Sequence, residues 1–288
     1  MHSVIEKLIA TGPVVTDGAW GTQLQARGLP IGACPDEWNL SQPAKVEEVA
    51  AAYVAAGSRI ILTNTFGANR IRLAEFGLAD KIMEINRQGA AISKKAAGQQ
   101  ALVFASMGPS GKMLVAGDVT EEELRNAFTD QAIALKEGGA DGLVIETMAE
   151  LEEAEIALAA AQTTGLPVVV CMTFDTGGRT MMGVAPDQAA RQFTMAGADV
   201  IGSNCGNGIS AFIPICQALR AVTDLPIWIK GNAGQPECIN GKVVYRITPE
   251  EFASHIPALR SAGANFIGGC CGTSPAHLRA VVNILARP

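Results

Sequence analysis

Three cysteines in the second half of the chain could hold a metal ion. Cys270 and Cys271 are adjacent in "FIGGCCGTSP", and Cys205 ends the apolar run "VIGSNC". Thiolates bind zinc, and three of them leave one position of a tetrahedral ion open for a substrate, as catalytic zinc sites do. Two alternatives stay open at this point: a vicinal disulfide, or cysteines that only fill space in the core.

Eight short apolar runs must position these cysteines, and they alternate with longer segments of helical period. The runs cover 14–19, 60–66, 102–109, 143–148, 168–175, 200–205, 227–234 and 266–273. Near-continuous apolar character is typical of strands that are buried on both faces, as in a parallel sheet covered by helices. The sequence therefore predicts an α/β fold, a single TIM (β/α)8 barrel domain over residues 1–288. A doubly wound open sheet is the alternative.

The segments between the runs carry clear signals for helix starts. Thr120 with Glu123 and Thr248 with Glu251 read as capping boxes, in which each side chain can bond the other residue's backbone N–H. Ser274, which precedes a proline, predicts the start of the last helix. These starts fall between the predicted strands, as the barrel requires.

In a β/α barrel, the active site is built from the loops that follow the strands. The sixth and eighth predicted strands are separated by a single strand, so Cys205 can meet Cys270 and Cys271 at the barrel mouth. Side chains alternate along a strand, so the adjacent pair converges only if the eighth strand stops there. The glycines on both sides of the pair permit this stop.

Composition excludes several classes of function. The formal net charge of -6 argues against a nucleic-acid surface, because phosphate binding needs a basic patch. No apolar stretch is long enough for a membrane span, and the start of the chain does not resemble a signal peptide. Seven cysteines, an odd number, fit a reducing compartment. We therefore expect a cytoplasmic protein with no membrane or nucleic-acid partner, and oligomer formation is left open.

Six motifs together resemble the homocysteine S-methyltransferase family: "DGAWGTQLQ", "TNTFGAN", "IETM", "NCGNG", "GNAGQP" and "GGCCGTSP". The family includes the homocysteine-binding barrel of cobalamin-dependent methionine synthase and the betaine-homocysteine methyltransferases. The resemblance covers nearly the whole chain. It implies a TIM barrel, Zn²⁺ held by Cys205, Cys270 and Cys271, and an enzyme that methylates homocysteine to methionine.

The resemblance also implies residues for binding homocysteine. Glu146 after the fourth run, with Asp17 and Gly18 after the first, would hold the amino group, and Asn204 of "NCGNG" belongs to the same site. From the residues alone, Glu146 and Asp17 could equally form interior salt bridges or helix caps.

The methyl donor is less well defined by the sequence. The printed chain ends at Pro288 without the further modules of methionine synthase, so we expect a small-molecule donor or a separate corrinoid protein. Trp20, Trp38 and Phe66 follow the first two runs, and aromatic faces attract quaternary ammonium and sulfonium groups. The sequence favours a small cationic donor, betaine-like or sulfonium, with methylcobalamin on a corrinoid protein as the alternative. Packing at the barrel mouth would equally explain the rings.

Other readings have less support. A zinc hydrolase would use His and Asp ligands, but His2, His255 and His277 lie outside the predicted strand ends. A structural zinc would need a fourth protein ligand, for which Cys238 is the one candidate. The segment 107–112, "MGPSGK", lacks the first glycine and the final Ser or Thr of a phosphate loop.

Overall fold

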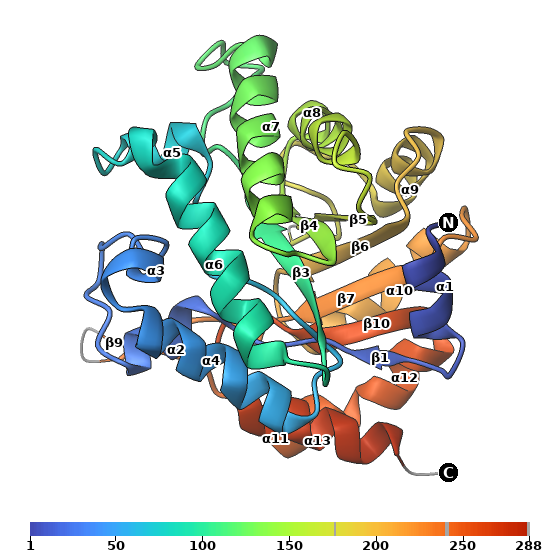
Figure 1. Ribbon diagram of the computed structural model, residues 1–288. Coiled ribbons are helices and arrows are strands. Elements are labelled where there is room, and N and C mark those ends of the chain that lie inside the picture. Colours follow the sequence, from blue (N-terminus) through green and yellow to red (C-terminus); the bar gives the residue numbers. More distant parts are fainter. Residues whose placement is uncertain (176, 240–241, 287–288) are drawn as a thin grey trace.

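The computed structural model describes residues 1–175, 177–239 and 242–286 (Figure 1). Residues 176, 240–241 and 287–288 of the predicted domain lie outside this description. Eight parallel strands form one sheet in the order β1-β10-β7-β6-β5-β4-β3-β2. They are β1 (Val14–Val15), β2 (Ile60–Ile61), β3 (Leu102–Met107), β4 (Gly142–Met148), β5 (Val168–Met172), β6 (Val200–Cys205), β7 (Ile227–Gly231) and β10 (Ala264–Gly269). Each falls in or at the edge of a predicted run, and the sheet curls into a nearly closed barrel, which confirms the predicted TIM-barrel fold.

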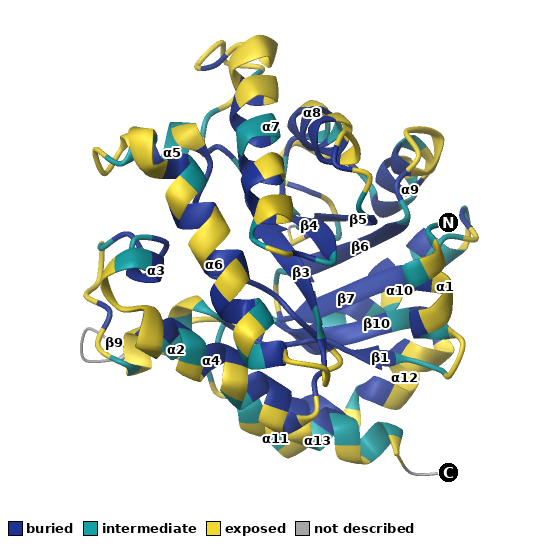
Figure 2. Cartoon of the chain, in the orientation of Figure 1, coloured by how far each residue is buried: buried dark blue, intermediate teal, exposed yellow. Residues whose placement is uncertain are grey.

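Helices surround the strands (Figure 1). They are α1 (Ser3–Ile9), α2 (Gly21–Ala26), α3 (Trp38–Ser41), α4 (Pro43–Ala56), α5 (Arg70–Ala74), α6 (Ile82–Ala97), α7 (Glu121–Glu137), α8 (Leu151–Gln162), α9 (Pro186–Met195), α10 (Phe212–Arg220), α11 (Pro249–Ser254), α12 (Ile256–Ser261) and α13 (Pro275–Leu285). The predicted starts at Thr120, Thr248 and Ser274 are confirmed as N-caps of α7, α11 and α13. Figure 2 shows the strands mostly buried, whereas the outer helices carry both buried and exposed residues.

Alternate strand residues fill the interior of the barrel. Phe104 and Phe266 pack against Trp228, with ring centroids 6.2 and 5.2 Å apart. Ile5 and Leu8 of α1 belong to the same apolar cluster, so this helix packs against the barrel interior. Because side chains alternate along a strand, positions two residues beyond these aromatic rings also face inward. This alternation carries the polar residues of the site.

The barrel closes differently between β1 and β2. Both strands are two residues long and no ladder pairs them. Arg59 N donates to Val15 O at 2.8 Å, and Leu62 N donates to the Asp17 carboxylate at 2.7 Å. The Asp17 side chain thus replaces a backbone acceptor between β1 and β2. We call this part of the barrel the β1/β2 seam.

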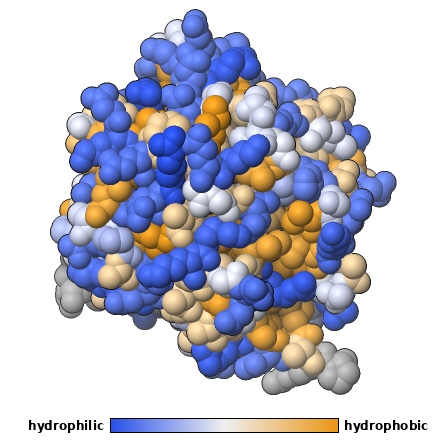
Figure 3. All heavy atoms as spheres, in the orientation of Figure 1, coloured by the Kyte–Doolittle hydropathy of each residue, from blue (hydrophilic) through white to orange (hydrophobic). Residues whose placement is uncertain are grey.

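An antiparallel hairpin that the sequence did not predict follows β7. It is formed by β8 (Glu237–Ile239) and β9 (Lys242–Val244). Figure 3 shows a face of the molecule with mostly hydrophilic residues and smaller hydrophobic areas between them. Among the described residues, no helix is both long and apolar enough to cross a bilayer.

Candidate active site

Three sulfur atoms meet at the carboxyl ends of β6 and β10. The Sγ atoms of Cys205, Cys270 and Cys271 all lie within 4.8 Å of one another. The backbone fixes the adjacent pair against the end of β7, since Cys270 N donates to Gly231 O at 2.8 Å and Ala233 N donates to Cys271 O at 2.9 Å. All three cysteines are free thiols, so the vicinal disulfide is not formed. Cys238 lies outside the group, exposed on β8.

The arrangement of these sulfurs fits a metal ion. A tetrahedral zinc with Zn–S bonds of about 2.3 Å separates its sulfur ligands by about 3.8 Å, which is compatible with the observed group. The soft, closely spaced thiol set is the type that zinc prefers. No fourth cysteine, histidine or carboxylate joins the group within the described residues. The three cysteines could therefore hold a metal and leave a coordination position open.

The thiols influence one another's protonation. Hydrogen bonds from the thiols of Cys270 and Cys271 lower the pKa of Cys205 to about 3. The bond between Cys205 and Cys270 raises the pKa of Cys270 to about 11, and the bond between Cys205 and Cys271 raises the pKa of Cys271. One negative charge is thus stabilised at the cluster before any metal binds, and a cation is attracted to it.

Backbone strain concentrates at this site. Among the described residues other than glycine, only Thr147 and Cys205 have positive φ, 64° and 70°. Asn204 holds Thr147 from two directions: it accepts from Thr147 N and donates to Thr147 Oγ1, each at 2.7 Å. Such strain persists only where surrounding contacts enforce it, and it is typical of functional sites.

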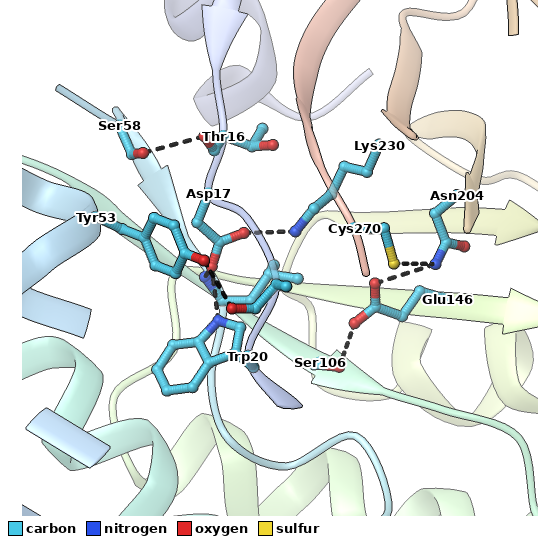
Figure 4. A network of polar contacts seen from close by, with 12 residues as sticks. Thr16, Asp17, Trp20, Tyr53, Ser58, Ser106, Glu146, Asn204, Lys230 and Cys270 are labelled. Atoms are coloured by element: carbon cyan, nitrogen blue, oxygen red, sulfur yellow. Dashed lines mark hydrogen bonds and ion pairs between the residues drawn. The ribbon is translucent and has the colours of Figure 1, made fainter. Parts of the chain in front are cut away.

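Glu146 lies beside the sulfurs on the inner face of β4 (Figure 4). Its Oε1 accepts from Ser106 Oγ at 2.5 Å, whereas among the described residues its Oε2 has only a long contact of 3.5 Å with Asn204 Nδ2. The same Asn204 amide lies 3.9 Å from Cys270 Sγ. Burial raises the pKa of Glu146 to about 7, although the ammonium of Lys230 opposes the rise. A cationic ligand would favour its ionised form.

Asp17 lies at the end of β1 and is fully buried. Its Oδ1 pairs with Lys230 Nζ at 2.5 Å, and its Oδ2 accepts from Trp20 Nε1 and Leu62 N, both at 2.7 Å (Figure 4). For Asp17, the structure therefore shows the interior salt bridge that the sequence left open as an alternative. Gly18 has no room for a side chain, because an added Cβ would lie 2.8 Å from two hydroxyl oxygens.

The three aromatic candidates for the donor side differ in their surroundings. Trp20 is half-buried and its indole N–H is bonded to Asp17. Trp38 is buried in the core, and Lys45 Nζ already lies 4.7 Å from its ring centroid. Phe66 is 41 % exposed. Phe66 is thus the candidate with the most accessible ring face.

Sequence reasoning missed Lys230, Ser106 and Tyr245. The first two had a signal, because each lies two residues beyond a buried aromatic residue in its strand and must face inward. Tyr245, in the segment after β9, has no such signal, because its hairpin was not predicted. Burial and the adjacent Cys271 raise the pKa of Tyr245 above its usual range.

Gly272 is predicted to be intolerant of substitution. Its φ is 80°, and a Cβ would overlap the ring of Tyr245. We expect Gly272→Ala to cost about 2 to 5 kcal/mol of unfolding free energy, from left-handed strain and displacement of the ring. Urea denaturation would measure this. Gly117→Ala is the matched control, since Gly117 has φ 76° and open space around it, and should cost only about 1 to 2 kcal/mol. Equal costs would contradict the packing argument.

The chain is similar to known proteins over nearly its whole length. Residues 14–285 match the sequence model of the family described as homocysteine S-methyltransferase. The chain is 30 % identical to the methionine synthases of Mycobacterium tuberculosis and Mycobacterium leprae. These alignments cover 95 % and 97 % of this chain but 24 % and 25 % of those proteins, so the chain spans about a quarter of their length.

Solved structures show the same fold. The metallated form of the homocysteine methyltransferase MmuM from Escherichia coli superposes with a TM-score of 0.80 at 23 % identity, covering 94 % of this chain and 95 % of that one. The oxidised form of MmuM gives a TM-score of 0.83 over 98 % of this chain and 99 % of that one. Since the family model spans nearly the whole barrel, the chain belongs to the homocysteine S-methyltransferase family.

Proposed function

We propose that this chain transfers a methyl group to the thiol of homocysteine and so forms methionine. The observation that carries the proposal is the meeting of three thiols beside the buried carboxylate of Glu146, whose Oε2 is held by no more than a 3.5 Å contact within the described residues. An amino acid that carries a thiol offers a sulfur that can join the three cysteines and an ammonium that can pair with Glu146. Membership of the family and the methionine synthase relatives support the same substrate.

In this proposal Cys205, Cys270 and Cys271 hold Zn²⁺. When bound, the ion would keep the homocysteine sulfur deprotonated and nucleophilic at neutral pH. Glu146 binds the substrate ammonium, and the amide nitrogen of Asn204 lies 3.5 Å from Glu146 Oε2 and 3.9 Å from Cys270 Sγ. The chain itself contributes positioning and electrostatics, which suffice when the electrophile is an activated methyl group.

For the donor, we propose a small cation of the betaine or sulfonium type. The accessible ring of Phe66 and the partly exposed ring of Trp20 support this choice, each contact being worth about 0.5 to 2 kcal/mol. Trp38 supports it less, because Lys45 occupies its ring face. A separate corrinoid protein that presents methylcobalamin is the second candidate.

An assay of the purified, zinc-loaded protein tests both levels of this proposal. Homocysteine is offered together with betaine, S-methylmethionine or methylcobalamin, and methionine is quantified. Methionine formation with betaine or S-methylmethionine supports the small cationic donor. Methionine formation with methylcobalamin and with neither cation would show that the corrinoid is the donor instead. Homocysteine binding is measured separately by calorimetry, and no binding to the zinc-loaded protein would overturn the proposed acceptor.

A further inference from the structure

Lys230 is buried in the centre of the barrel. Its side chain is 2 % exposed, and within the described part of the chain no other Lys or Arg is buried. A lysine is almost never fully buried without a partner, and the partner here is Asp17, which is 0 % exposed. The two residues are 213 positions apart in the sequence. Their pairing is therefore a property of the closed barrel.

The pair is built into the β1/β2 seam. Asp17 Oδ2 accepts from Leu62 N, just beyond β2, where β1 offers no ladder acceptor. It also accepts from the indole of Trp20. A carboxylate has about four acceptor positions, so these two bonds and the ammonium of Lys230 use most of its capacity and neutralise its charge. Asp17 thus joins β1, β2 and β7.

The surroundings of Glu146 differ from those of Asp17. No ion pair reaches it within the described residues, and one of its oxygens has only the 3.5 Å contact with Asn204. Figure 4 shows Glu146 next to Cys270, with Asp17 and Lys230 paired to each other. Of the two carboxylates, Glu146 is therefore the one that is not held in a salt bridge, and it lies close to the sulfur of Cys270.

We infer that Lys230 is a positioning residue that takes Asp17 as its counter-ion, so that Asp17 closes the barrel seam and Glu146 alone receives the substrate ammonium. This inference rests on the proposed function and changes the role that the family resemblance implies for Asp17. It makes the site specific for a ligand with one ammonium group near its thiol.

The test is a double-mutant cycle with Asp17→Asn, Lys230→Met and both together. Each single substitution leaves a buried charge without its partner, whereas the double substitution removes both charges. The asparagine side chain retains an oxygen that can accept from Trp20 and Leu62. We expect each single variant of the metal-free protein to melt about 10 °C lower, and the double variant to recover most of that loss.

The split between KM and kcat distinguishes positioning from substrate contact. With zinc and donor present, the double variant should keep the homocysteine KM within about threefold of wild type, whereas Glu146→Gln should raise it about 100-fold. If Asp17 binds the ammonium directly, Asp17→Asn and the double variant will show the same large rise in KM. That result would overturn the inference.

Two further outcomes are decisive. If a single variant does not fold, the KM of the folded double variant still decides between the two roles of Asp17. If wild type binds no homocysteine, the proposed function and the role of Glu146 fail together, and the melting temperatures alone judge the Asp17–Lys230 pair. Losses in the single variants that simply add in the double variant would refute the pairing.

Discussion

Cys270→Ala is expected to remove bound zinc and to abolish methyl transfer. The substitution leaves two sulfurs where the geometry offers three within 4.8 Å. Since loss of a residue that merely supports a metal ligand costs about 10- to 100-fold in affinity, we expect loss of a ligand to cost more than about 100-fold. Metal content after dialysis, measured by elemental analysis, and the rate of methionine formation would both report the change.

Cys238→Ala is the matched control for this experiment. Cys238 is an exposed free thiol on the hairpin and lies outside the sulfur group. The variant should retain stoichiometric zinc and full activity. If Cys270→Ala kept its metal, the assignment of the metal ligands would be refuted. If Cys238→Ala lost its metal, a structural site that includes Cys238 would be favoured.

Glu146→Gln is expected to raise the homocysteine KM about 100-fold while zinc content stays the same. The amide oxygen can still accept a hydrogen bond but carries no charge to attract the substrate ammonium, and loss of a buried charged partner costs about 2 to 5 kcal/mol. Because the pKa of Glu146 is about 7, the wild-type carboxylate loses its charge as the pH falls through that value. The ratio of the two KM values should therefore shrink between about pH 8 and about pH 6. A ratio near one at pH 8 would exclude Glu146 from substrate binding.

The same substitution should stabilise the ligand-free protein at alkaline pH. The pKa of Glu146 is raised from 4.5 to about 7, so its protonated form stabilises the fold below pH 4.5, and this stability is lost as the pH rises through 7. Glutamine does not titrate. The variant should gain up to about 3 kcal/mol over wild type at about pH 8, and little at about pH 4.5. Urea unfolding at the two pH values would measure the difference.

The prediction of the barrel succeeded because the strands are buried on both faces and read as apolar runs. Each of the eight predicted runs overlaps a strand, although β1 and β2 keep only two residues each. The three cysteines could be grouped in advance, since carboxyl ends of parallel strands meet at one end of a barrel. The hairpin β8–β9 was missed because its strands are only three residues long, although the sequence places an Asn-Gly pair, a typical hairpin signal, between them.

The sequence by itself determined which side chains face the barrel interior, because alternation along a strand places Glu146, Asn204 and Lys230 on the inner face once the strands are known. Only the tertiary structure decided which of these side chains pair. Lys230 lies on a strand two positions from β1 in the sheet, and its ammonium forms a salt bridge with Asp17, whereas no salt bridge reaches Glu146 among the described residues. An unpaired charge is costly when it is buried, so the pairing of these groups strongly affects stability. Their burial is a property of the closed barrel rather than of any local stretch of chain.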